Sequence, residues 1–124
     1  ILLADDYMVN QMVLVAMLKK MGASVDVASN GKEAFELYQE HPLDYDLILM
    51  DCEMPEQDGY VTTQDIRAFE QQQHLRPICV VALTAYVQEQ QQQRCFDAGM
   101  NDFLSKPLTF NTLKSCLLKY LEVS

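Results

Sequence analysis

Short apolar runs that end in polar residues constrain the fold of this chain more than any other feature. Ile1–Ala4, Leu47–Met50, Val80–Leu83 and Phe103–Leu104 are followed, directly or after one residue, by Asp5 and Asp6, Asp51, Thr84 and Lys106. Continuous apolar runs of this length are typical of strands buried on both faces, as in a parallel sheet. Because parallel strands end at one edge of their sheet, we expect these polar side chains to share one site.

Helix-like segments separate the strand-like ones. We expect strands at Ile1–Ala4, Ser24–Ala28, Leu47–Met50, Ile78–Leu83 and Asp102–Leu104, and helices at Val9–Met21, Lys32–Gln39, Tyr60–Gln73, Val87–Ala98 and from Thr109 to about Tyr120. Strict alternation with short loops predicts an α/β fold, a single doubly wound five-stranded parallel sheet with five helices on two faces. Right-handed crossovers favour the flavodoxin-like strand order 2-1-3-4-5, in which the ends of the first and third strands are neighbours.

Local patterns add detail to this outline. The apolar stripe of the first helix follows Val9, Met12, Val13, Ala16 and Met17, with Lys20 on the same side, and Gly22 is a plausible end. Thr109 can cap the last helix. Gly59 follows Asp58 in a turn, where we expect it to adopt a positive φ.

Size and charge limit the possible functions. The 124 residues suit one domain, which we expect to be a piece of a longer protein, and the formal net charge of −9 argues against nucleic acid or an anionic membrane as a direct partner. The apolar runs are too short to span a bilayer. The four scattered cysteines favour reduced thiols in a cytoplasmic compartment, even if the parent protein is anchored in the inner membrane. For the isolated domain we expect a monomer.

Three carboxylates at one strand edge point to a divalent cation. Two like charges ~4 Å apart repel by about 4 kcal/mol at an effective dielectric constant of 20, so either one acid is protonated or a cation lies among them. Oxygen ligands favour Mg²⁺. We expect Asp6 as a direct ligand, Asp51 as a ligand through one oxygen, and Asp5 as a ligand or a contact through water, with the backbone carbonyl of Glu53 completing the set. Alternatively, Asp5 and Asp6 merely cap the next helix.

The same residues suit phosphoryl transfer to a carboxylate. Asp51 can attack phosphorus and form an acyl phosphate, Lys106 can neutralise developing charge, and Thr84 can donate a hydrogen bond to a phosphoryl oxygen. Taken singly, Lys106 could be a surface lysine and Thr84 an ordinary strand-end residue. Pro107 biases the preceding lysine away from helical geometry, and a cis bond would aim it inward.

The chain resembles receiver domains of two-component phosphorelay signalling. The resemblance is carried, in order, by Asp5-Asp6, Met50-Asp51 through Met54-Pro55, Asp58-Gly59, Leu83-Thr84-Ala85, Ala98-Gly99 and Lys106-Pro107. It implies that Asp51 accepts phosphate from a histidine of a kinase or a histidine phosphotransfer domain, with Mg²⁺ at Asp6, Asp51 and the Glu53 carbonyl. It also implies a switch through Thr84 and Phe103 that alters the surface around the fourth helix, fifth strand and fifth helix.

Several sequence segments are similar to those of receiver domains attached to hybrid sensor histidine kinases. Such receivers pass phosphate on to a histidine phosphotransfer domain. The segments are Asn10-Gln11-Met12-Val13, Met50-Asp51-Cys52-Glu53-Met54-Pro55, Ala82-Leu83-Thr84-Ala85 and Ala98-Gly99-Met100-Asn101-Asp102. Tyr7 departs from the Asn often found after the acid pair. We also expect Glu53 and Tyr86 to flank the path of an attacking water. Tyr86 would then shield the acyl phosphate, so that Tyr86→Ala speeds dephosphorylation.

Other functions remain open at this point. The first is a stand-alone response regulator that acts by protein contact, and the second is a degenerate receiver that binds partners without phosphorylation. A magnesium-dependent phosphatase of the haloacid dehalogenase type would need a D-x-D pattern on the first strand and a cap domain, whereas Asp5 and Asp6 are adjacent. A flavodoxin would need a phosphate-binding loop where these acids lie. A receiver would catalyse its own phosphorylation and dephosphorylation, and would not be a conventional turnover enzyme.

Overall fold

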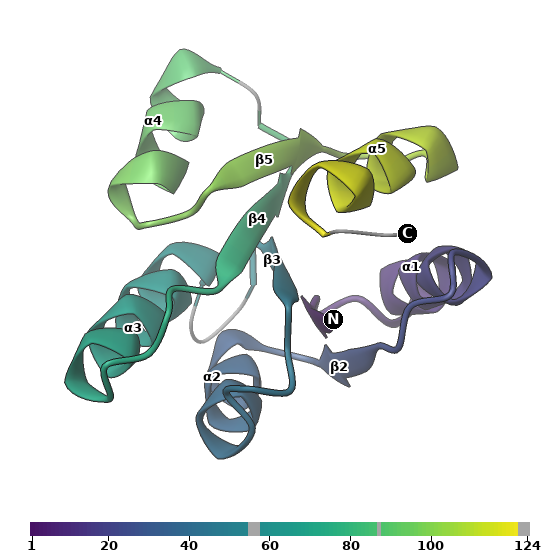
Figure 1. Ribbon diagram of the computed structural model, residues 1–124. Helices are drawn as coiled ribbons and strands as arrows, with labels where there is room; N and C mark the ends of the chain where they lie inside the picture. Colours follow the sequence, from purple (N-terminus) through teal and green to yellow (C-terminus); the bar gives the residue numbers. More distant parts are fainter. Residues whose placement is uncertain (55–57, 87, 122–124) are drawn as a thin grey trace.

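The computed structural model describes residues 1–54, 58–86 and 88–121. Strands and helices alternate along the chain: β1 Leu2–Ala4, α1 Met8–Lys20, β2 Asp26–Ala28, α2 Gly31–Glu40, β3 Leu47–Asp51, α3 Gly59–Gln72, β4 Cys79–Thr84, α4 Glu89–Asp97, β5 Asp102–Ser105 and α5 Phe110–Tyr120. The strands form one parallel sheet in the order β2-β1-β3-β4-β5 (Figure 1). The predicted fold class and strand order are confirmed, and the predicted strands and helices differ from the observed ones at their ends.

The central strand β3 positions the polar edge. All five of its residues are buried, and it pairs with β1 on one side and β4 on the other. Ala4 is in register with Met50, and Asp51 is in register with Leu83. The residues that follow these positions, Asp5 and Thr84, therefore emerge beside Asp51 at the carboxyl edge of the sheet.

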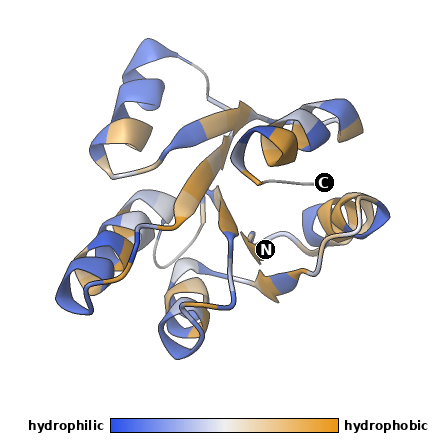
Figure 2. Ribbon diagram, in the orientation of Figure 1, coloured by the Kyte–Doolittle hydropathy of each residue, from blue (hydrophilic) through white to orange (hydrophobic). Residues whose placement is uncertain are grey.

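Helices cover both faces of the sheet. One apolar core lies under α2, α3 and α4, and the other lies under α1 and α5 (Figure 1). Figure 2 shows most of the sheet coloured as hydrophobic and much of the outer surface of α2, α3 and α4 as hydrophilic. Among residues 1–54, 58–86 and 88–121, no helix combines the length and apolar character needed to cross a membrane.

Most of the apolar stripe expected along α1 does not face the core. Leu14 and Leu18 pack into the core, whereas Val9, Met12 and Val13 are 48–67 % exposed. The helix is apolar over much of its circumference, and hydrophobic colouring covers much of α1 in Figure 2. Spacing alone therefore could not decide which apolar row faces the sheet, and α1 presents an apolar surface to solvent.

Caps and glycines fix several of the loops. Asn30, Asp58 and Thr109 each accept a hydrogen bond from a backbone N–H of the helix that follows, as predicted for Thr109. Gly22 ends α1 with a φ of 88°. Gly59 does not adopt the positive φ we expected, because it begins α3; a Cβ there would collide with the backbone oxygen of Asp51. Glycine at position 59 is needed for close packing against the Asp51 strand end.

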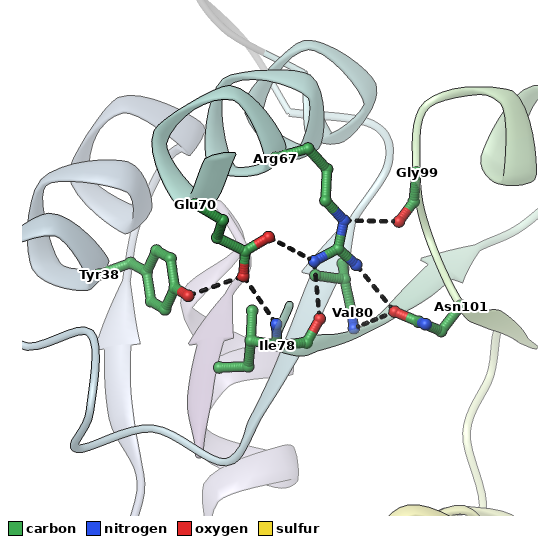
Figure 3. A network of polar contacts seen from close by, with 7 residues as sticks. All are labelled: Tyr38, Arg67, Glu70, Ile78, Val80, Gly99 and Asn101. Carbon is green, nitrogen blue, oxygen red and sulfur yellow. Dashed lines mark hydrogen bonds and ion pairs between the residues drawn. The ribbon is translucent and has the colours of Figure 1, made fainter. Parts of the chain in front are cut away.

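A polar network ties α2, α3, β4 and the α4–β5 turn together away from the carboxyl edge (Figure 3). Arg67 donates to the backbone oxygens of Gly99 and Ile78 and to the side chains of Glu70 and Asn101. Glu70 also accepts from the Tyr38 hydroxyl at 2.8 Å and from the Ile78 backbone N–H at 2.7 Å. The network fixes the start of β4 and the approach to β5, and so supports the strand ends that carry Thr84 and Lys106.

Candidate functional site

Three acids from two strand ends converge as the sequence predicts. Carboxylate oxygens of Asp5, Asp6 and Asp51 all lie within 4.8 Å of one another. Asp5 and Asp51 are 0 % and 1 % exposed, while Asp6 is open to solvent. The arrangement places two buried carboxylates beside an exposed one at the edge of the sheet, which is a cation-binding geometry that solvent can reach.

Asp5 is held in place but only partly satisfied. Its Oδ1 accepts from the Tyr7 backbone N–H at 2.9 Å, whereas its buried Oδ2 has no hydrogen-bond partner among the described residues. Burial raises the pKa of Asp5 above its ordinary value, against the lowering effects of the Tyr7 N–H and Lys106. The helix-cap alternative fails, because α1 begins at Met8 with Tyr7 as its N-cap residue and no side-chain cap bond.

Asp51 forms an ion pair with Lys106. Its Oδ1 accepts from Lys106 Nζ at 2.8 Å and from the Glu53 backbone N–H at 3.0 Å. Burial raises the pKa of Asp51 to about 6, with Asp5 adding to the rise and the two hydrogen bonds opposing it. Burial disfavours the charged form of Lys106, but the hydrogen bond to Asp51 and the nearby negative charges together outweigh it and raise the pKa of Lys106. The ammonium therefore stays charged and faces a carboxylate that is costly to ionise.

The residues expected to act as a switch lie nearby, with one unexpected contact. Thr84 is buried, and its hydroxyl donates to Glu53 Oε1 at 2.8 Å. Phe103, on β5, is half-buried and lies edge-on to Phe96 of α4, with ring centroids 6.3 Å apart. Tyr86 is 52 % exposed just beyond Thr84. Thr84 and Phe103 thus each have a side-chain contact that would be lost if that side chain moved.

The loops around the edge hold two more features. The Lys106–Pro107 bond is cis, the option the sequence left open. Asn10 and Gln11, expected only to resemble the hybrid-kinase receivers, act on Asp5: the Asn10 side chain helps to lower the pKa of Asp5, and Gln11 Nε2 donates to its backbone oxygen. An amide pair three residues beyond the acid pair, near the start of α1, is the sequence signal for this support. Pro55 of the expected motif and Val87, the expected start of the fourth helix, lie outside the described residues.

The donor set fits a divalent cation with oxygen ligands. A buried, unpartnered carboxylate oxygen on Asp5 is costly unless a cation or proton satisfies it. Three carboxylates without a nearby thiolate or imidazole ligand among the described residues favour Mg²⁺ over a softer metal. The residues that would hold it are Asp5, Asp6, Asp51 and the Glu53 carbonyl.

The chain is similar to a known protein family and to solved structures. Residues 1–118 match the response regulator receiver domain family. The chain belongs to this family. The receiver domain is 43 % identical over 120 residues to hybrid signal transduction histidine kinase E of Dictyostelium discoideum, which covers 96 % of this chain and 7 % of that protein. The receiver domain therefore spans a small part of the relative that it matches.

Solved structures agree with the fold and the family. The receiver domain of the Saccharomyces cerevisiae response regulator Ssk1, in co-crystals with the histidine phosphotransfer protein Ypd1, superposes with a TM-score of 0.90 at 31 % identity, covering 96 % of this chain and 86 % of that chain. The receiver domain of a Pseudomonas aeruginosa sensor histidine kinase superposes with a TM-score of 0.83 at 37 % identity, covering 98 % and 96 %. That structure has a magnesium ion coordinated in its active site cleft.

Proposed function

We propose that this receiver domain accepts a phosphoryl group on Asp51 from a phosphohistidine and so acts in a phosphorelay. The observation that carries the proposal is the buried Asp51 carboxylate, paired with Lys106 at 2.8 Å and clustered with Asp5 and Asp6. A nucleophile, a fixed cation and a divalent-cation site are the parts that phosphoryl transfer needs. The residues fit this chemistry better than the phosphatase or flavodoxin alternatives, and membership of the receiver family supports it.

The transfer step uses groups already in place. Both hydrogen bonds from described residues to Asp51 fall on Oδ1, so we assign Oδ2 as the nucleophile. Oδ2 forms a bond to phosphorus while the phosphorus–nitrogen bond of the donor breaks, and the leaving imidazole takes up a proton. Lys106 balances negative charge on the transferring group, and bound Mg²⁺ would supply further charge neutralisation. The acyl phosphate on Asp51 then draws the Thr84 hydroxyl, and Phe103 follows to alter the α4, β5 and α5 surface.

The exposed face of α1 supports a protein as the phosphoryl donor or acceptor. Beside the acid cluster this face carries large apolar residues that are 48–70 % exposed: Tyr7, Met8, Val9, Met12 and Val13. Such a contiguous apolar patch marks an interaction surface. We infer that a histidine phosphotransfer domain docks on it, which brings a histidine over Asp51. The Ypd1 complex of the structural relative is consistent with this kind of partner.

We propose that this receiver domain is one module of a larger protein. The relatives it matches include hybrid histidine kinases of which it covers 7 %, so we infer that residues 1–124 form a receiver domain within a hybrid histidine kinase. A stand-alone response regulator is the alternative. We also propose a cytoplasmic location for the domain, since all four cysteines are free thiols.

Intact-mass measurement tests the proposal directly. Incubation with acetyl phosphate and Mg²⁺ should add one phosphoryl group to the wild-type domain and none to Asp51→Asn. Labelling that persists in Asp51→Asn would refute Asp51 as the acceptor, and continuous hydrolysis of small phosphomonoesters would favour a phosphatase. Chelation of divalent cations should suppress the labelling of the wild type.

A second experiment separates docking from chemistry. Met12→Glu should slow phosphoryl transfer from a phosphorylated histidine phosphotransfer domain and leave labelling by acetyl phosphate unchanged, since a small donor needs no docking surface. Leu43→Glu is the matched control, because Leu43 is 85 % exposed in the loop before β3. Equal slowing by both variants would show that α1 is not the docking surface.

A further inference from the structure

We propose that the side chain of Glu53 is a latch that holds Thr84 in its unphosphorylated position and so sets how readily the domain switches. The inference rests on the proposed function, because the latch matters only if Thr84 must serve a phosphoryl group on Asp51. It concerns the Glu53 carboxylate, and not the backbone carbonyl assigned above to the metal.

The hydrogen bonds around Thr84 identify the latch. The hydroxyl donates to Glu53 Oε1 at 2.8 Å, and its oxygen accepts from the Tyr86 backbone N–H at 3.0 Å. The backbone oxygen of Tyr86, at 3.3 Å, is a second and more distant acceptor. A carboxylate is the stronger acceptor of the two, since a charged partner roughly doubles the strength of a hydrogen bond.

A threonine hydroxyl carries one proton, so Thr84 can donate a hydrogen bond either to Glu53 or to a phosphoryl group, but not to both. While the hydroxyl donates to Glu53, it cannot donate to a phosphoryl oxygen on Asp51. A phosphoryl group must therefore compete with a carboxylate that is already bonded at 2.8 Å. Switching requires that Glu53 release the hydroxyl, and the latch lowers the fraction of molecules that are ready to switch.

The position of Glu53 makes release practicable. Its backbone N–H donates to Asp51 Oδ1 at 3.0 Å, which anchors the residue next to the phosphoryl acceptor. The residue itself is exposed, so water can solvate the carboxylate once it leaves Thr84. The latch thus opens into solvent and does not bury a charge.

Two substitutions distinguish a hydrogen-bond latch from a charge effect. Glu53→Ala removes the acceptor and the charge but keeps the backbone carbonyl. Glu53→Gln removes the charge and keeps a carbonyl acceptor at the same reach. Glu36→Ala, on the exposed side of α2, is the control for the same change in net charge.

Two quantities are measured for each variant. The first is the affinity of the domain for beryllofluoride with saturating Mg²⁺, and the second is the NMR signal of the Thr84 methyl group in the unliganded domain. Glu53→Ala should bind beryllofluoride about two- to tenfold more tightly and shift the Thr84 methyl signal, in line with the loss of one hydrogen bond. Glu53→Gln should fall between the wild type and Glu53→Ala, because it keeps a neutral and therefore weaker acceptor, and Glu36→Ala should match the wild type. In a Thr84→Val background, Glu53→Ala should have no further effect.

Other outcomes overturn the latch or the function beneath it. Unchanged affinity and an unshifted Thr84 signal in Glu53→Ala would refute the latch, as would equal tightening by Glu53→Gln and Glu53→Ala, which would assign the effect to charge. A wild-type domain that takes up neither beryllofluoride nor a phosphoryl group from acetyl phosphate would instead refute the proposed function. The two failures are therefore distinguishable.

Discussion

In the described part of this domain, two buried carboxylates each form an ion pair with a basic side chain, and the two pairs differ in how completely their polar atoms are hydrogen-bonded. Lys106 meets Asp51 at 2.8 Å at the carboxyl edge of the sheet, and Arg67 meets Glu70 at 2.8 Å at the other end of β4. Glu70 also accepts from Tyr38 and Ile78, and the Arg67 guanidinium donates to four acceptors (Figure 3). Asp51 instead lies beside Asp5, whose Oδ2 has no partner among the described residues.

The difference separates a structural network from a reactive one. In the Arg67–Glu70 pair a planar fork matches fixed acceptors, so each charge is compensated within the protein. At Asp51 burial raises the pKa to about 6 because the neighbouring groups do not compensate the charge fully. The first arrangement stabilises the fold, whereas the second, under the proposed function, would bind a cation and a phosphoryl group. Substitutions in either pair therefore test this contrast.

The largest expected effect is on the satisfied network. Arg67→Ala should lower the free energy of unfolding by about 3–5 kcal/mol, because it leaves Glu70, which is 2 % exposed, as an uncompensated buried charge. Urea unfolding at neutral pH measures the loss. Lys106→Ala, measured with saturating Mg²⁺, is the matched change at the reactive pair and should cost less, since the cation can neutralise Asp51. A larger cost for Lys106→Ala would contradict the contrast.

The next effect is a pH dependence that belongs to the reactive pair. A carboxyl whose pKa rises from 3.8 to about 6 on folding binds more protons in the folded state between these values. Its contribution to stability is therefore complete below about pH 4 and is lost as the pH rises through 6. Without divalent cations, stability relative to Asp51→Asn should fall by about 2–3 kcal/mol over this range. A relative stability that is flat or rises with pH would show that Asp51 is compensated as Glu70 is.

A third test removes the unsatisfied acid itself. Asp5→Asn should weaken Mg²⁺ binding by about 10–100-fold, as expected for the loss of a charged group around a metal. Without cations the variant should be at least as stable as the wild type, because a neutral amide relieves repulsion with Asp51. Calorimetric titration and urea unfolding measure the two effects. Glu36→Gln, the same charge change on exposed α2, should alter neither, and a loss of stability in Asp5→Asn would indicate that Asp5 is a structural acid.

The sequence predicted the geometry of the carboxyl edge well because its signals are local. Apolar runs located the strands, alternation gave the topology, and strand ends brought Asp5, Asp6 and Asp51 within 4.8 Å. It failed where a choice depended on packing. On α1 several apolar rows compete, and Leu14 and Leu18 face the core in place of Val9 and Met12. At Gly59 the constraint is contact with the Asp51 backbone and not a positive φ, which no local pattern could show.

The satisfied network was beyond reach of the sequence. Arg67, Glu70 and Tyr38 look like ordinary polar and aromatic positions on two helices, and their contacts join residues up to 34 positions apart, as between Arg67 and Asn101. The hydrogen bond from Thr84 to Glu53 joins side chains 31 residues apart and was also unforeseen. Residue types at strand ends indicate which chemistry is possible, whereas the geometry of side chains decides which groups are already satisfied.

The smallest expected effect comes from removing a single hydrogen bond to the buried Glu70 carboxylate. Tyr38→Phe removes the hydroxyl that donates to Glu70 at 2.8 Å and keeps the ring that packs edge-on against Phe69. It should lower the free energy of unfolding by about 1–3 kcal/mol, because a buried carboxylate loses one of its donors. Tyr45→Phe is the matched control, since the Tyr45 hydroxyl donates to Asp26, an exposed acid that water can solvate. If Tyr45→Phe lowers the free energy of unfolding as much as Tyr38→Phe does, then the Arg67 network does not owe its stabilising effect to the complete hydrogen bonding of Glu70.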